Sequence, residues 1–70
     1  MFWHLEFYWV NPDGMRTGGD IVNDASSSVE LVIAEAKSMM QNITFPWGKA
    51  NLCLVKSQDG NLVHEGVANA

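Results

Sequence analysis

An alternating apolar pattern at the start of the chain constrains the fold more than any other feature. Residues 2–10 are rich in aromatic side chains, which is typical of a β-strand. Successive side chains of a strand point to opposite faces. One face of this segment is therefore wholly apolar, with Trp3, Leu5, Phe7 and Trp9. Such a face has to be covered by another layer, so residues 2–10 predict a strand of a sheet that packs against something else.

A turn and a second strand are expected next. Asn11-Pro12-Asp13-Gly14 favours a turn, because proline presets φ at the second position and glycine tolerates a left-handed conformation. Residues 15–22 then return as a strand. Gly18-Gly19 weakens a regular strand and indicates a bulge or an irregular edge within it.

The middle of the chain predicts one amphipathic helix over residues 28–41. Its apolar positions recur at the helical spacing: Val29, Val32, Ile33, Ala36, Met40 and Ile43. Ser27 and Glu30 form a capping box at its start, with Asp24 or Ser26 as alternative caps.

A loop and a second hairpin complete the chain. Pro46 prevents the helix from continuing, so we expect residues 44–49 to form a short loop. Strands are predicted over 51–57 and 61–68, because Asp59-Gly60 between them is a strong hairpin signal. Alternation separates two apolar sets, Leu52, Leu54 and Leu62 against Cys53, Val55, Val63 and Val67. Neither set is polar, so both faces of this hairpin should be at least partly covered.

Together these elements predict a single α+β domain over residues 1–70, arranged ββαββ. We expect an antiparallel sheet of three to four strands with one helix packed across one face. A chain of 70 residues buries only roughly 60% of its unfolded surface, which makes it marginally stable. The single Cys53 excludes an intramolecular disulfide, so self-association is the expected source of added stability.

Charge and cysteine content exclude several classes of function. Eight acidic residues against four basic ones give a net charge of −4, which argues against nucleic-acid binding. The apolar N-terminal run lacks a basic leader and is too short to span a bilayer, so no membrane partner is expected. One unpaired cysteine without an export signal predicts a cytoplasmic protein.

No catalytic, cofactor-binding or metal site is expected. The possible metal ligands are His4, Glu6, Cys53, His64 and Glu65. Alternation places His64 and Glu65 on opposite faces, so a full ligand set is hard to assemble. Cys53 and His64 could be adjacent across the hairpin. A reactive thiolate needs an electropositive, open setting, however, and Cys53 lies between two leucines in an acidic chain.

Aromatic side chains exceed what one helix can cover. The chain has three Trp, three Phe and one Tyr, of which the first strand can bury three. Aromatic residues outside a core are enriched as interface anchors. Two candidate partner-binding surfaces follow, the sheet face opposite the helix and the loop after the helix. Their residues are Phe2, Tyr8 and Val10 for the face, and Phe45 and Trp47 for the loop.

Two segments carry a resemblance to other proteins. They are Val32-x-x-x-Ala36 in the helix and Val55-x-x-x-Asp59-Gly60-Asn61-Leu62-Val63 at the end. In these the chain resembles a group of short uncharacterised bacterial proteins with a hairpin–helix–hairpin layout, over about its last two thirds. The resemblance implies the fold alone, because that group has no established activity to transfer.

Three functional hypotheses follow from the sequence. The leading one is a non-enzymatic protein-interaction module of unknown partner, expected to be a homodimer or to bind another protein through the helix-free sheet face or a strand edge. The second is an inhibitor from a mobile genetic element, such as an anti-CRISPR-like protein, that places clustered acids in a basic groove. Its acids would be Asp13, Asp20, Asp24 and Glu30. The third is a small ligand-binding domain or enzyme with its site at a dimer interface.

Overall fold

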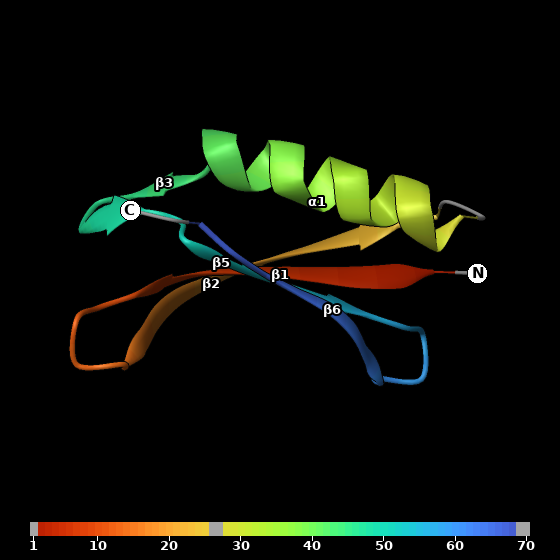
Figure 1. Cartoon of the computed structure of the whole chain (residues 1–70), viewed down its shortest axis with the longest axis horizontal. Coiled ribbons are helices and arrows are strands. Elements are labelled where there is room, and N and C mark those ends of the chain that lie inside the picture. Colours follow the sequence, from red (N-terminus) through yellow and green to blue (C-terminus); the bar gives the residue numbers. More distant parts are fainter. Residues whose placement is uncertain (1, 26–27, 69–70) are drawn as a thin grey trace.

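The computed structural model describes residues 2–25 and 28–68 and has two layers, a four-stranded antiparallel sheet and one helix (Figure 1). The elements are β1 (Trp3–Val10), β2 (Arg16–Asp24), α1 (Val29–Asn42), β3 (Thr44–Phe45), β4 (Gly48–Lys49), β5 (Leu52–Lys56) and β6 (Leu62–Val67). The large sheet has the strand order β2-β1-β5-β6, and β3 pairs with β4 separately. This arrangement confirms the predicted α+β class.

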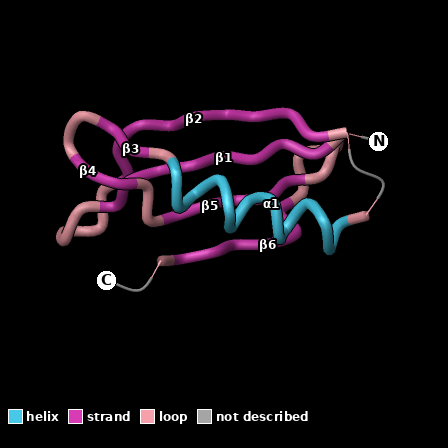
Figure 2. Tube along the Cα trace, turned by 90° about the horizontal axis from the view of Figure 1, so that it is seen from above, coloured by secondary structure: helices cyan, strands magenta, loops and turns pink. Residues whose placement is uncertain are grey.

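The helix covers one face of the sheet. Figure 2 shows α1 crossing above β5, with β2 along one edge of the sheet and β6 along the other. With 14 residues, α1 is too short for a bilayer, and no helix in the described part of the chain is long and apolar enough to cross one.

The core forms between α1 and the apolar face of β1. Its buried side chains are Trp3, Leu5 and Phe7 from β1, Val32, Ala36 and Met40 from α1, and Cys53 and Val55 from β5. Trp9 shares the β1 face but is only half-buried, because it lies under the small hairpin instead of the helix. A Cβ on Gly48 would stand 2.7 Å from the Trp9 indole nitrogen, so only glycine fits over the ring.

The predicted irregularity at Gly18-Gly19 is a β-bulge. Phe7 lies opposite Asp20 and Trp9 opposite Thr17, so Gly18 and Gly19 together lie opposite the single residue Tyr8. Their φ angles are 93° and 132°, which side-chain-bearing residues rarely adopt. β2 continues to Asp24, beyond the predicted strand end at residue 22, because Asn23 and Asp24 still pair with His4 and Trp3.

The helix start and the loop after the helix differ from expectation. The N-cap is Ser28, whose Oγ accepts a hydrogen bond of 3.5 Å from the Leu31 amide, while Asp24 belongs to β2. The expected cap Ser27 and the alternative Ser26 lie outside the described residues. Residues 44–49 are not a plain loop. They form the β3–β4 hairpin, because the chain reverses over Pro46-Trp47.

In the second hairpin, the predicted grouping of Val63 and Val67 with Cys53 and Val55 on one face was wrong. Cys53 and Val55 belong to the core under α1, as an alternating set should. Val67 lies opposite Leu52, however, and therefore on the helix-free face. Alternation fixes faces within one strand, whereas the relation between two strands depends on the turn. Here the Ser57–Asn61 turn and a register shift beside Lys56 set that relation.

Candidate protein-interaction surface

A polar network closes the centre of the helix-free face. The Tyr8 hydroxyl donates a hydrogen bond to Glu6, and Lys56 Nζ lies 2.9 Å from the other Glu6 oxygen. The bond from Tyr8, followed by Lys56, lowers the pKa of Glu6, and the same bond raises the pKa of Tyr8. The Arg16 guanidinium lies 5.8 Å from the centre of the Tyr8 ring. Tyr8 is therefore engaged within the chain.

An exposed apolar strip lies beside this network on β6. We define the β6 strip as Leu62, Val63 and Val67, whose side chains are 53%, 45% and 66% exposed. The register shift between Val55 and Lys56 inserts an extra residue in β6, so Leu62 and Val63 stand together near Lys56. In the adjacent strand, Leu52 and Leu54 point to the same face but are buried. Three of the exposed aliphatic side chains of this face therefore lie on β6, and Ile21, 62% exposed, lies on β2 at the other edge.

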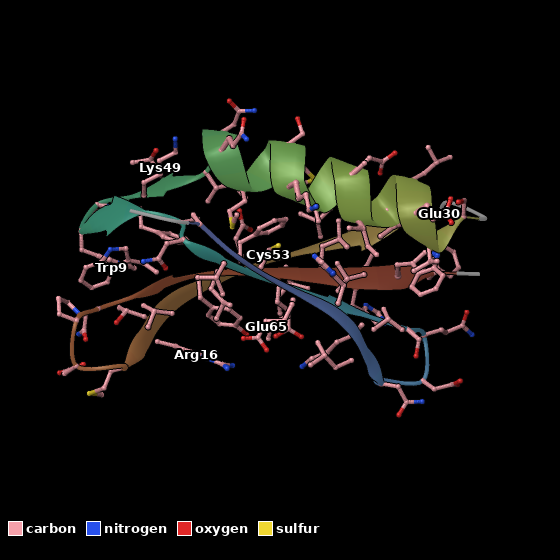
Figure 3. All side chains as sticks on the ribbon, viewed as in Figure 1. Trp9, Arg16, Glu30, Lys49, Cys53 and Glu65 are labelled. Carbon is pink, nitrogen blue, oxygen red and sulfur yellow. The ribbon has the colours of Figure 1, made fainter. Side chains whose placement is uncertain are left out.

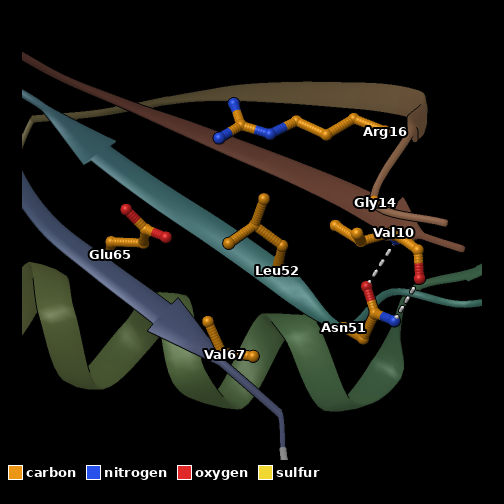
Figure 4. Close-up of a pocket in the computed structure, with 7 residues that line it drawn as sticks. All are labelled: Val10, Gly14, Arg16, Asn51, Leu52, Glu65 and Val67. Atoms are coloured by element: carbon orange, nitrogen blue, oxygen red, sulfur yellow. Dashed lines mark hydrogen bonds between the residues drawn. The ribbon is translucent and has the colours of Figure 1, made fainter. Parts of the chain in front are cut away.

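A hollow of about 370 Å³ adjoins the β6 strip (Figure 4). Its lining residues are Val10, Gly14, Arg16, Asn51, Leu52, Glu65 and Val67. Asn51 is held in place, because Val10 N–H donates to its Oδ1 at 2.7 Å and its Nδ2 donates to Val10 O at 3.0 Å. Figure 4 shows Leu52 between the Arg16 and Glu65 side chains. The hollow thus has an apolar floor with one cation and one anion at its rim.

The predicted partner-binding residues lie in three separate places. Tyr8 and Val10 are half-buried on the helix-free face. Phe2 is exposed at the opposite end of β1 from Val10. Phe45 and Trp47 stack in the β3–β4 hairpin with ring centres 5.5 Å apart; Phe45 packs against the core and Trp47 is exposed.

The sequence reasoning missed the β6 strip, because it searched for aromatic side chains and placed Val63 and Val67 on the core side. The available signal was the aliphatic composition of residues 62–67, which carry a single charged residue, Glu65.

Cys53 and His64 are brought near each other, as their positions in the hairpin allowed. A Cβ on Gly66 would lie 2.8 Å from Cys53 Sγ and 3.3 Å from His64 Nε2. Cys53 is fully buried between the sheet and α1 (Figure 3), and this burial raises the pKa of its thiol. His64 Nε2 is buried without a hydrogen-bond partner among the described residues. A neutral, enclosed thiol is a poor nucleophile. The described residues also include no cluster of three metal-ligating side chains.

The acids proposed to gather on one surface are spread along the molecule. Asp13 lies in the β1–β2 turn, whereas Asp24 pairs with Trp3 at the other end of that hairpin. A hydrogen bond with Asp24 raises the pKa of the exposed Glu35 on α1, which shows that these two carboxyls are neighbours. The four acids named above therefore do not form a single patch.

Comparison with known proteins identifies no relative. No protein-family profile, curated protein or solved structure matches this chain.

Proposed function

We propose that this protein is a small, non-enzymatic interaction module that self-associates through the β6 side of its helix-free face. The observation that supports this proposal is the β6 strip, with Leu62 and Val63 at one end of the strand, Val67 at the other and Glu65 between them; the three aliphatic side chains are each about half exposed or more. Exposed apolar side chains gathered on one side of a small domain are typical of contact sites.

The size of the protein strengthens this interpretation. Its accessible surface is 4479 Å², and a standard protein contact covers about 800 Å² on each partner. One contact of that size would cover about 18% of the accessible surface of the chain. It would also supply the buried apolar area that a 70-residue chain lacks.

Other parts of the helix-free face are less suited to the contact. The Tyr8–Glu6–Lys56 network already satisfies its polar groups within the chain. Burying it would remove charged groups from water without giving them new partners, which is unfavourable. The hollow next to Val67 has room for a side chain from a second copy, and it keeps the ligand-binding hypothesis open.

Light scattering on three forms of the protein tests the proposal. The wild type should have twice the chain mass of 7.7 kDa, and Val67→Lys should be monomeric, because a lysine charge in an apolar contact is costly. Ile21→Lys is the matched control. Ile21 is 62% exposed on the same face but belongs to β2, at the opposite edge.

Ile21→Lys should retain the wild-type mass. A monomeric wild type would overturn self-association. A dimeric Val67→Lys would overturn the assignment of the contact to the β6 strip.

A further inference from the structure

We infer that two copies join edge to edge through β6, so that two four-stranded sheets become one continuous antiparallel sheet. This inference rests on the proposed self-association and specifies its geometry. It follows from a difference between the two free edges of the sheet, from the direction of the backbone groups of β6, and from the order of its side chains.

The β2 edge is protected against strand addition. Natural sheets block free edges with bulges, charges or covering segments. The Gly18-Gly19 bulge interrupts β2, and acidic side chains follow it at Asp20 and Asp24. The Phe45 ring packs over the face of β2 at this bulge, 3.2 Å from the position that a Cβ of Gly18 would occupy.

The β6 edge is less protected along residues 64–67, which follow the extra residue at the start of the strand. Its pairing with β5 is regular there, it contains neither lysine nor proline, and Glu65 is its one charge. Strand order places β6 at the end of the sheet, so its outer side faces no other strand of that sheet. An edge of this kind is a template for another strand.

Hydrogen bonding fixes which backbone groups of β6 point outward. Ala68 N–H donates to Asn51 O at 2.9 Å, so the backbone at Ala68 faces β5. Facing alternates along an antiparallel strand. The N–H and C=O groups of Val67 and Glu65 are therefore directed away from β5, toward the free edge.

The side chains of β6 suit a second copy of the same strand. A two-fold axis through Glu65 places Val63 of one copy opposite Val67 of the other, and Val67 opposite Val63. Directly opposed β-branched side chains stabilise a strand pair, and here two such pairs flank the two Glu65 side chains on the axis. The Glu65 carboxylates are exposed to solvent, which screens their repulsion, but this like-charge pair lowers the affinity of the dimer. Because this axis is perpendicular to the sheet, both β6 strips lie on the same face. Pairing brings the opposed valines into lateral contact, which covers part of their exposed surface while the face itself stays open.

Proline scanning at an outward position separates edge pairing from simple side-chain contact. Val67→Pro removes an N–H that the β5–β6 ladder does not use, and proline is tolerated on an edge strand where its nitrogen faces solvent. Val67→Thr is the matched control, because it keeps the N–H and a β-branched side chain. Sedimentation equilibrium should show at least a tenfold weaker dimer for Val67→Pro than for Val67→Thr. Equal dimerisation of both variants would overturn edge pairing while leaving self-association intact.

Amide hydrogen exchange of the wild type provides a test that does not depend on a variant folding. The Glu65 and Val67 amides should become protected as concentration rises through the dimer transition. The Gly66 amide, which faces β5, should be protected at every concentration. A wild-type dimer in which Glu65 and Val67 still exchange freely would overturn the inference. A wild type that stays monomeric would instead overturn the proposed function.

Discussion

Truncating Leu62 to alanine should weaken self-association strongly and leave the fold intact. The Leu62 side chain is 53% exposed in the single chain, and the proposed contact can cover at most that fraction of it. The substitution removes three carbon atoms, each worth about 0.8 kcal/mol when fully buried. Scaled by the exposed fraction, the loss is at most about 1.3 kcal/mol per copy, or about 2.5 kcal/mol for a symmetric dimer. At about 1.4 kcal/mol per tenfold change, the dissociation constant should rise by up to about 60-fold.

Leu31→Ala is the matched control for this measurement. Leu31 is also a leucine, is 59% exposed, and lies on α1, on the other side of the sheet from the β6 strip. Sedimentation equilibrium of both variants gives the two dissociation constants, and circular dichroism checks that each is folded. The reasoning is refuted if Leu62→Ala dimerises as tightly as the wild type, or if Leu31→Ala weakens the dimer by the same factor.

Three further predictions concern the single chain. Gly66→Ala should lower the free energy of unfolding by roughly 1–3 kcal/mol in urea, because its Cβ would stand 2.8 Å from Cys53 Sγ; an unchanged midpoint would contradict this packing. Cys53 should react with a thiol reagent only as fast as the chain opens, since it is fully buried and burial raises its pKa; rapid labelling of the folded protein would show an open site. Hydrogen bonds from Tyr8 and Lys56 lower the pKa of Glu6 in the folded chain, so the ionised Glu6 should stabilise the fold fully above pH 4.5, its ordinary pKa, and lose this effect as the pH falls through the lowered pKa. Glu6→Gln should remove this part of the acid dependence of stability. An identical acid unfolding profile for both proteins would contradict the network.

Much of the fold could be predicted because local signals were strong. The aromatic alternation of β1 identified its buried face, and the apolar spacing around Val32 and Ala36 identified α1. Gly18-Gly19 correctly indicated a bulge, since consecutive glycines within a strand mark backbone that other residues cannot adopt. Each of these features is determined by residues close together in the sequence.

The β3–β4 hairpin and the faces of β6 could not be predicted from sequence in the same way. The hairpin has only two residues in each strand, too few for an alternating pattern. The faces of β6 depend on how the chain turns at Gly60, which has a φ of 87° and whose amide donates to Ser57 O. That turn, together with the extra residue beside Lys56, places Val63 and Val67 on the helix-free face.

The search for a functional surface in the sequence was directed at aromatic side chains. Aromatic side chains are frequent interface anchors, which drew attention to Tyr8 and Phe45. In the folded chain Tyr8 bonds to Glu6, and Phe45 packs against the core and Trp47. The exposed apolar surface beside the Tyr8 network is aliphatic and lies on an edge strand. Only the three-dimensional arrangement distinguishes that edge from the protected one at β2.

Sedimentation equilibrium of the unmodified protein over a wide concentration range tests self-association most directly. The average mass should rise with concentration from the 7.7 kDa chain to twice that value and level off there, because pairing through β6 leaves no second unprotected edge. A mass that stays at that of one chain up to the highest concentration would contradict self-association. A mass that keeps rising beyond two chains would contradict a closed dimer through one edge.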